Sequence, residues 1–199
     1  MYGAAGPLED GVRVAANYTA RVKLTIPEHA LVLLAGPAGA GKSVFARKHF
    51  KPTEILSSDS CRGLVSDDEN DQTASKDAFE VLHFIAAKRL RGRRLTVIDA
   101  TNVQPEARRS LVDLARQHGI PAVLIVLNLP ESVCVDRNLR RAERSLGQDV
   151  VLKQAEDLRR SLPHLKSEGF RQIYVLDSPE AIEAAEIARQ DASGLPRSC

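Results

Sequence analysis

This sequence has few aromatic residues and almost equal numbers of basic and acidic residues. Its 199 residues include no tryptophan, five phenylalanines and three tyrosines. This scarcity argues against a nucleic-acid binder that stacks many bases on aromatic side chains. With 28 basic and 26 acidic residues the formal net charge is only +2, so the chain as a whole does not attract nucleic acid. Any such contact must come from a local basic patch.

Cysteines and long apolar runs are equally sparse. Cys61, Cys134 and Cys199 are odd in number and far apart, and they match neither a disulfide framework nor a CxxC metal site. The first residues lack the charged start and apolar core of a signal peptide. The longest apolar runs, Leu31–Ala35 and Ala122–Leu127, are too short to cross a bilayer. We therefore expect a cytoplasmic protein with no membrane partner.

Size and composition predict one globular domain with flexible ends. Hydrophobic residues make up 43% of the chain and charged residues 27%, as in ordinary soluble proteins. Residues 1–20 show no sustained period and are expected to form a flexible N-terminal arm, and residues 191–199 a flexible C-terminal tail. The folded domain is expected over residues 21–190.

Short apolar segments alternate with helical patterns between these ends. Strands are predicted at Val22–Ile26, Leu31–Ala35, Glu54–Ser57, Leu95–Ile98, Ala122–Leu127 and Gln172–Leu176. Helices are predicted at Lys42–Phe50, Thr73–Arg91, Pro105–His118, Pro130–Ser145, Val150–Lys166 and Pro179–Arg189. This alternation predicts an α/β fold with a doubly wound, mostly parallel central sheet. Ligands of such folds bind at the carboxyl ends of the strands.

The segment Gly36–Ser43 has the pattern GxxxxGK[ST] between a predicted strand and a predicted helix, which is the context of a phosphate-binding loop. Glycines let backbone N–H groups approach phosphate oxygens, Lys42 would reach the β- and γ-phosphates, and the Ser43 hydroxyl would bind Mg²⁺. The residues expected to bind the nucleotide are Gly36, Ala38, Gly39, Ala40, Gly41, Lys42, Ser43 and Val44. The alternative is a chance glycine-rich turn, against which the flanking pattern argues.

GTPases, motor ATPases and kinases all share such a loop. The segment Asn128–Glu131 (NLPE) is not the NKxD-like guanine-binding motif expected of a GTPase, and the chain is short for a motor. A kinase remains. It needs a base for the acceptor hydroxyl and cations around the transferring phosphoryl group.

Two carboxylates compete for the role of base. Asp59 follows the strand Glu54–Ser57 and precedes Arg62 by three residues, so it is a candidate base with Arg62 as a phosphate clamp. The alternative is that Ser58, Asp59 or Ser60 caps a short helix. Asp99 follows the next strand and resembles the Walker B position, which binds the metal directly or through water. It could instead form an Asx turn or serve as the base.

A basic stripe marks the predicted helix Pro130–Ser145. Its members, which fall within an arc of about 100° on a helix, are Arg137, Arg140, Arg141 and Arg144. Because the helix follows a central strand, it could be a lid that closes arginines over a triphosphate. The alternative is a solvated face on which Asp136 and Glu143 are neighbours.

These motifs resemble the 5′-kinase module of bacterial polynucleotide kinase-phosphatases, the RNA end-healing enzymes of the P-loop phosphotransferase superfamily. The most specific match is Ser57–Lys76 (SSDSCRGLVSDDENDQTASK). Further matches are Lys23–Glu28, the phosphate-binding loop, Asp99–Asn102, Asn128–Glu131, Arg137–Arg141, Glu168–Arg171 and Ser178–Glu180. The resemblance covers about residues 22–190.

The resemblance implies a three-layer P-loop kinase fold with a helical lid. It also implies transfer of the γ-phosphate of ATP to a 5′-OH end of RNA or DNA, with Mg²⁺, in nucleic-acid repair. The catalytic residues that it implies are Lys42, Asp59 as base, Arg62 on the reacting phosphates, and the lid arginines Arg137 and Arg141, which also bind the nucleotide. Ser43 and Asp99 are then the metal residues, with Asp99 in a supporting role.

The family enzymes continue into a metallophosphatase and a ligase-like domain, whereas this chain ends at Cys199. We therefore expect a stand-alone kinase or an excised domain, with separate phosphatase and ligase partners. A homodimer is the base-rate expectation. Val44 replaces the commoner threonine after the loop serine. Two alternatives stay open, which are a small-molecule kinase acting on a nucleoside, an adenylylsulfate or a sugar, and a non-catalytic nucleotide-binding adaptor.

Overall fold

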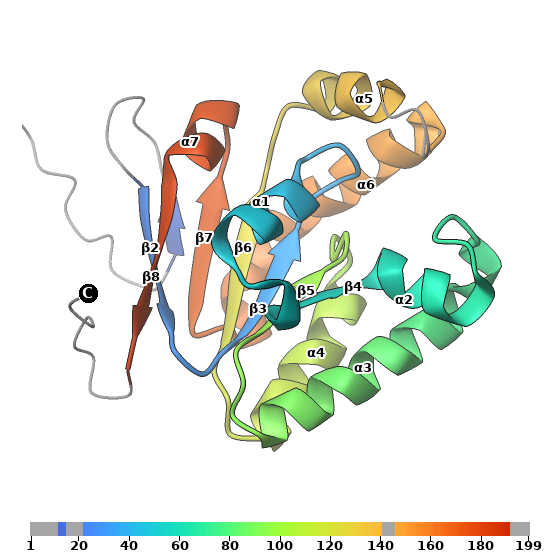
Figure 1. The fold of residues 1–199 in the computed structure, drawn as a ribbon. Helices are drawn as coiled ribbons and strands as arrows, with labels where there is room; N and C mark the ends of the chain where they lie inside the picture. Colours follow the sequence, from blue (N-terminus) through green and yellow to red (C-terminus); the bar gives the residue numbers. More distant parts are fainter. Residues whose placement is uncertain (1–11, 15–21, 141–145, 192–199) are drawn as a thin grey trace, which may run out of the picture.

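The computed structural model describes residues 12–14, 22–140 and 146–191 of the chain. Its centre is a six-stranded sheet in the order β1–β7–β6–β3–β5–β4, and all neighbouring strands run parallel (Figure 1). The strands are β1 (Val12–Val14), β3 (Leu31–Ala35), β4 (Ile55–Ser57), β5 (Thr96–Asp99), β6 (Ala122–Leu127) and β7 (Gln172–Leu176). The predicted α/β fold with a parallel sheet is confirmed.

The two central strands explain why the sheet needs helices on both faces. Every residue of β3 and β6 is buried. Because side chains alternate between the faces of a strand, Leu33 belongs to one hydrophobic cluster and its neighbours Val32 and Leu34 to the other. Uninterrupted apolar strands of this kind occur where both faces of a parallel sheet are covered.

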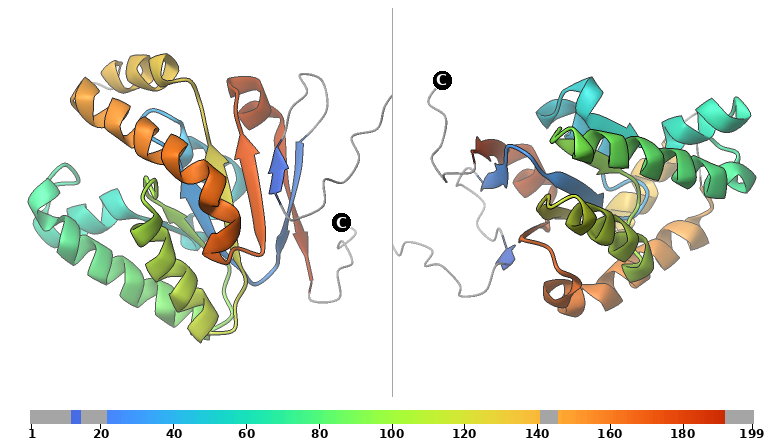
Figure 2. Two further views of the ribbon diagram at one scale, coloured as in Figure 1. Left: turned by 180° about the vertical axis from the view of Figure 1, so that it is seen from behind. Right: turned by 90° about the horizontal axis from the view of Figure 1, so that it is seen from below.

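Helices pack on both faces and complete three layers. They are α1 (Lys42–His49), α2 (Ser58–Ser66), α3 (Ser75–Arg91), α4 (Pro105–Gln117), α5 (Glu131–Leu139), α6 (Gln148–Ser161) and α7 (Pro179–Ala184). Phe45 of α1 packs in one cluster, whereas Leu82 of α3 and Leu111 of α4 pack in the other. Seen from behind in Figure 2, α4 and α6 lie in front of the strands, and α1 lies in front of them in Figure 1. No helix in the described ranges has both the length and the apolar character to span a bilayer.

Apart from the predicted C-terminal helix, three predicted helices differ from the structure by more than one residue at their ends. Short 3₁₀ segments, Gln72–Ala74 and Leu162–Glu168, replace the start of the predicted helix at Thr73 and the end of the one at Val150. The predicted helix Pro130–Ser145 is wrong at its C-terminal end, because α5 stops at Leu139 and Arg140 is its C-cap. α2 follows β4 directly. It is not among the predicted helices, and it corresponds to the short helix in the capping alternative for Ser58, Asp59 or Ser60.

A second, two-stranded sheet corrects the predicted C-terminal helix. Residues 179–189 are not one helix, because only α7 is helical and β8 (Ala185–Gln190) follows it. β8 pairs in parallel with β2 (Val22–Pro27), which is therefore not part of the main sheet. Within the predicted N-terminal arm, β1 pairs with β7 at the edge of the main sheet. The rest of that arm and nearly all of the predicted tail lie outside the described residues.

Candidate active site

The phosphate-binding loop lies between β3 and α1, at the carboxyl edge of the sheet. Its first residue, Gly36, donates its N–H to the carbonyl of Thr101 at 2.9 Å, which ties the loop to the turn after β5. Gly39 and Gly41 have φ of +83° and +96°, a conformation that glycine adopts without a steric penalty. Gly41 is also the N-cap of α1, so the loop opens directly into a helix N-terminus. This arrangement fits a polyphosphate, because the N–H groups and the helix dipole favour an anion there.

Lys42 is almost fully buried inside the loop. Its ammonium group donates to the carbonyl oxygens of Gly36 and Pro37, at 2.8 and 2.9 Å. The amine is therefore held within a few ångströms of the loop's own backbone, where a phosphate oxygen could replace a carbonyl as its acceptor.

Asp99, at the end of β5, lies beside the loop and is 6% exposed. Burial raises the pKa of its carboxyl group above the ordinary value, and this outweighs the lowering effects of a hydrogen bond from Ser43 and the charge of Lys42. A hydroxyl and a carboxylate are hard oxygen ligands that suit Mg²⁺. Among the described residues no group of three or more histidines, cysteines and acidic residues could hold a metal. Two oxygen ligands fit Mg²⁺, which usually takes its other ligands from phosphates and water.

Asp59 and Arg62 lie on α2, at the carboxyl end of β4. The Ser57 hydroxyl accepts hydrogen bonds from the N–H groups of Asp59 and Ser60, so Ser57 is the N-cap and Asp59 is in the first turn. Arg62 donates through Nη2 to Oδ1 of Asp59 at 2.8 Å. The capping alternative and the candidate base are thus compatible, because the cap is one residue earlier than expected.

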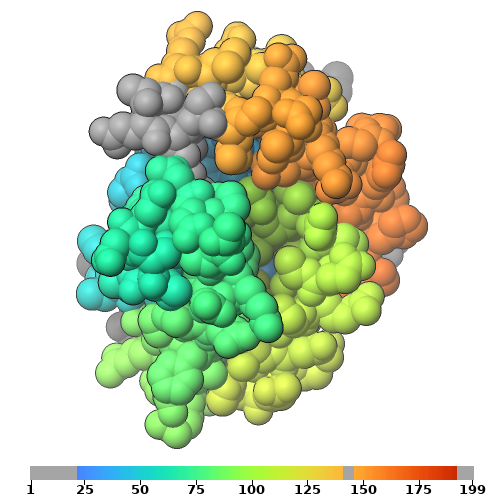
Figure 3. Space-filling model, turned by 90° about the vertical axis from the view of Figure 1, so that its right-hand side faces the viewer, coloured from blue at the N-terminus to red at the C-terminus, as the bar shows by residue number. Residues whose placement is uncertain are grey.

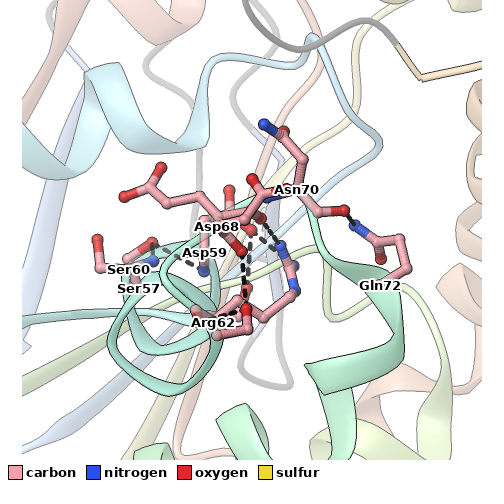
Figure 4. A network of polar contacts seen from close by, with 10 residues as sticks. Ser57, Asp59, Ser60, Arg62, Asp68, Asn70 and Gln72 are labelled. Carbon is pink, nitrogen blue, oxygen red and sulfur yellow. Dashed lines mark hydrogen bonds and ion pairs between the residues drawn. The ribbon is translucent and has the colours of Figure 1, made fainter.

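Arg62 joins Asp59 to the acidic loop that follows α2. Its side chain is 7% exposed, and its second guanidinium nitrogen donates to the backbone carbonyl of Glu69. The loop also bonds to itself, since Asp68 accepts from the N–H of Asn70 and Asp71 accepts from Thr73. Figure 4 shows Arg62 between Asp59 and this loop. The fixed Arg62 side chain in turn fixes the orientation of the Asp59 carboxylate.

One pocket contains most of these groups. Its lining residues include Ala38, Gly39, Gly41, Lys42, Ser43, Asp59, Arg62, Asp99, Thr101, Asn138 and Gln154. Figure 3 shows the surface hollowed between the α2 region in teal and α6 in orange. The structure therefore brings five of the predicted loop residues together with the base, the clamp and Asp99. Of the other three, Ala40 and Val44 line a second pocket, and Gly36 lines neither of these two pockets. On the α3 side the first of these pockets is lined by Gln72, Ser75 and Phe79. Gln72 and Ser75 fall within the Ser57–Lys76 match without a predicted role, and no sequence pattern singles out Phe79.

The predicted lid is described only in part. Arg137 on α5 lies over the loop, because a Cβ atom built at Gly41 would be 3.9 Å from its Nη1. Arg137 lines a second pocket with Val44 and Ile182, on the α7 side of the loop rather than the Asp59 side. Arg140 is the exposed C-cap of α5. Arg141 and Arg144 lie outside the described residues, so the continuous stripe stays a prediction.

Two further side chains shape the site, and no sequence motif predicts them. Asn138 is 1% exposed, and its amide donates to the carbonyl of Leu146 at 2.8 Å and accepts from the N–H of Leu146 at 3.4 Å. It thereby joins α5 to Leu146, two residues before α6 begins. Behind the loop, the fully buried Arg108 forms an ion pair with Glu168 and donates to the carbonyls of Asn102 and Val103, which fixes the turn after Asp99. Only the charge of a helical arginine was visible in the sequence, not its burial.

Comparison with known proteins gives a family and a fold. A family model described as an AAA domain matches residues 31–165. Among solved structures, a chain of the Pnkp1/Rnl/Hen1 RNA repair complex has a TM-score of 0.60 at 19% identity, covering 70% of this chain and 47% of that chain. This chain thus spans about half the length of that relative.

Two other structures share the fold at low identity. One is the AvrRxo1-ORF1:AvrRxo1-ORF2 complex with sulphate ions, with a TM-score of 0.59, 14% identity and coverage of 76% and 55%. The other is the PezAT toxin-antitoxin system of Streptococcus pneumoniae, with a TM-score of 0.50, 20% identity and coverage of 79% and 70%. At these identities the likeness concerns the fold alone. The matched family model spans more than half of the chain, and the chain therefore belongs to the AAA domain family, with a P-loop kinase-like fold.

Proposed function

We propose that the protein is an ATP-dependent polynucleotide 5′-hydroxyl kinase. The observation that carries the proposal is the single pocket in which Lys42 and Ser43 of the phosphate-binding loop face Asp59 and Arg62 of α2. A phosphoryl donor at the loop and an acceptor hydroxyl at Asp59 would then share one cavity. Transfer between them needs close approach more than covalent chemistry from the protein.

The donor side of the proposal rests on the loop and on the second pocket. Backbone N–H groups and Lys42 would hold the phosphates, and the pocket beside Val44, Arg137 and Ile182 would take the nucleoside. Mg²⁺ would neutralise charge on the phosphates, held by the Ser43 hydroxyl and by Asp99 directly or through water. Lys42 would exchange its carbonyl partners for phosphate oxygens.

On the acceptor side, Asp59 would act as the general base. The hydroxyl oxygen attacks the γ-phosphorus, its proton passes to the Asp59 carboxylate, and the bond from phosphorus to the leaving ADP oxygen breaks. Arg62 is within 2.8 Å of the Asp59 carboxylate, so it would offset charge on the phosphates beside the base. The lid arginines Arg137 and Arg141 would add further positive charge beside the phosphates.

The choice of a polynucleotide end as acceptor rests on the sequence resemblance, chiefly Ser57–Lys76, which supplies both Asp59 and Arg62. The fold likeness to a chain of an RNA repair complex supports the same choice. Phosphatase and ligase partners, a homodimer and a cytoplasmic location stay predictions that accompany this proposal.

The test is an acceptor screen with γ-labelled ATP and Mg²⁺. Label is expected on 5′-OH RNA or DNA oligonucleotides and not on nucleosides, an adenylylsulfate or sugars. Asp59→Asn should lower the rate by about 10²- to 10⁴-fold, the usual contribution of a general base. Asp67→Asn is the matched control, because Asp67 is the C-cap of the same helix in a left-handed conformation that asparagine tolerates.

Each other outcome of the screen has a definite meaning. Label on a small acceptor alone would replace the polynucleotide with a small-molecule substrate. Unchanged turnover in Asp59→Asn would remove Asp59 as the base and make Asp99 the next carboxylate to test. Nucleotide binding without transfer to any acceptor would favour the adaptor alternative.

A further inference from the structure

A side chain from α6 occupies a hydrogen-bonding position on the phosphate-binding loop. The Oε1 atom of Gln154 accepts a hydrogen bond from the N–H of Ala38 at 2.8 Å. The two residues are 116 positions apart in the sequence, so the contact joins the helix after the lid to the loop. Both residues line the pocket that also contains Lys42, Ser43 and Asp59.

The direction of this bond is fixed by chemistry. A backbone N–H can only donate, so the amide of Gln154 must present its oxygen to Ala38. Loop N–H groups are the donors that phosphate oxygens use in this class of site. The amide oxygen therefore occupies, at Ala38, the place of an anionic oxygen. The same side chain also carries an NH₂ group, which is a donor that an incoming phosphate oxygen can accept from.

The backbone beneath Gln154 is held in place on both sides. Val151 packs in one hydrophobic cluster and Leu158 in the other, so α6 is anchored to both faces of the core. The Asn138–Leu146 hydrogen bonds join the residue two positions before α6 to α5. A rotation of the Gln154 side chain is therefore enough to change the partner of its amide, with α6 kept in its packed position.

We propose that Gln154 is a specificity-determining residue that distinguishes a nucleoside triphosphate from a diphosphate. Its amide oxygen holds the Ala38 N–H, and on binding of a triphosphate the side chain releases that N–H and donates its own NH₂ to the terminal phosphoryl group. A diphosphate lacks that group and leaves the Gln154–Ala38 bond in place. The inference rests on the donor half of the proposed function and is independent of the acceptor.

The test compares the binding of ADP and of a non-hydrolysable ATP analogue by titration calorimetry. Gln154→Glu keeps an oxygen for Ala38 but adds a negative charge and removes the donor. It should weaken binding of the analogue by about 10-fold or more and binding of ADP by much less, because a hydrogen bond to a charged phosphate is stronger than one between neutral groups. Gln154→Leu should also lower the ratio of the affinity for the analogue to the affinity for ADP. Gln148→Glu is the control, because Gln148 is exposed at the start of the same helix and receives the same charge.

A spectroscopic readout separates a direct contact from a structural effect. The amide ¹⁵N–¹H signal of Ala38 should shift with the ATP analogue and stay near its nucleotide-free position with ADP. If Gln154→Glu and Gln154→Leu keep the wild-type ratio of the two affinities, the inference is wrong while the proposed function stands. If the wild-type protein binds neither nucleotide, both fail. Binding of both nucleotides with no phosphoryl transfer would overturn the proposed function alone.

Discussion

At Asp99 the stability of the fold and the chemistry of the site favour different protonation states of the carboxyl group. Its carboxyl group is nearly inaccessible to water, and burial raises its pKa despite the nearby Ser43 hydroxyl and Lys42 ammonium groups. A raised pKa means that the folded protein holds the proton more tightly than the unfolded chain does. The charged form is therefore a cost to folding at neutral pH, and a bound cation would offset this cost.

This conflict predicts that Asp99→Asn stabilises the fold and damages the site. Because the pKa of Asp99 is raised above its ordinary 3.8, the unfavourable effect is absent at low pH and grows as pH rises through the folded-state pKa. At neutral pH we expect the variant to be more stable by about 1 kcal/mol, because replacing a residue that is kept for activity often raises stability. Urea unfolding at several pH values measures the difference, and Mg²⁺-dependent nucleotide binding should weaken. A variant that is less stable at neutral pH would show that Ser43 and Lys42 overcompensate for burial.

At the scale of elements, the phosphate-binding loop and α5 meet at one glycine. A Cβ atom built at Gly39 would overlap the backbone carbonyl oxygen of Cys134 on α5, and φ there is +83°. Backbone on both sides leaves no flexible side chain to move away. The close approach of α5 to the loop therefore depends on the absence of a side chain at Gly39 as well as on the backbone angle.

Gly39→Ala should accordingly lower the free energy of unfolding more than an alanine substitution at another glycine with positive φ does. Gly119→Ala is a matched control, because φ is +62° there and a Cβ atom would meet no atom within 4 Å. We expect about 1–2 kcal/mol from the left-handed strain alone in the control. Gly39→Ala should lose more than that and should also lose nucleotide affinity, which the control retains. Thermal unfolding and nucleotide titration of both variants measure this. Equal losses of stability in the two variants would mean that α5 moves away from the added methyl group without a loss of free energy.

Elements that local pattern defines were predictable, and elements that distant pairing defines were not. The loop and α1, α3 and α4 follow from glycine spacing, caps and helical period. The apolar residues of 179–190 suit a helix, but Ile187 becomes part of β8 because β2 offers a partner strand from the other end of the chain. β1 could not be predicted from the sequence either, because its three residues lack a sustained pattern and form a strand by pairing with β7.

The same division runs through the candidate site at the scale of the whole molecule. Lys42 and Ser43 lie within a motif, and Asp59 and Asp99 lie at or within two residues of the ends of predicted strands. Parallel topology therefore predicts that these residues meet. Gln154 reaches the loop from a helix 116 residues away, through a contact that no local pattern encodes. Asn138 stood inside a recognisable arginine-rich stretch, but its clamp on Leu146 depends on where α5 ends.

Two long-range contacts fix the second sheet to the rest of the molecule. The hydroxyl of Tyr174 on β7 bonds the backbone N–H and carbonyl of Thr25 on β2, at 3.0 and 2.6 Å. On β8, Arg189 donates two hydrogen bonds to the carboxylate of Glu54, at 2.9 and 2.7 Å, across 135 residues. Burial alone would raise the pKa of Glu54, but the hydrogen bonds from Arg189 and from the Lys51 backbone lower it overall.

The Glu54–Arg189 pair should therefore contribute measurably to global stability, in contrast to a surface pair of equal length. In a double-mutant cycle with Glu54→Gln and Arg189→Gln we expect a coupling of about 1–2 kcal/mol, moderated because Arg189 is about one-third exposed. The cycle at Lys48–Glu183, also 2.7 Å apart but 39% and 82% exposed, should give less than about 0.5 kcal/mol.

The pH dependence of the first cycle supplies an independent check. Because the pKa of Glu54 lies below its ordinary 4.5 in the folded protein, the coupling should be complete above that pH and lost as pH falls through the folded-state value. Urea unfolding of the four proteins in a series from pH 7 down to the lowest pH at which they still fold measures this. Equal coupling in the two cycles would show that the second sheet is held by apolar packing and the Tyr174 hydroxyl. A coupling that does not decline anywhere in this pH series would contradict the predicted dependence on the charge of Glu54.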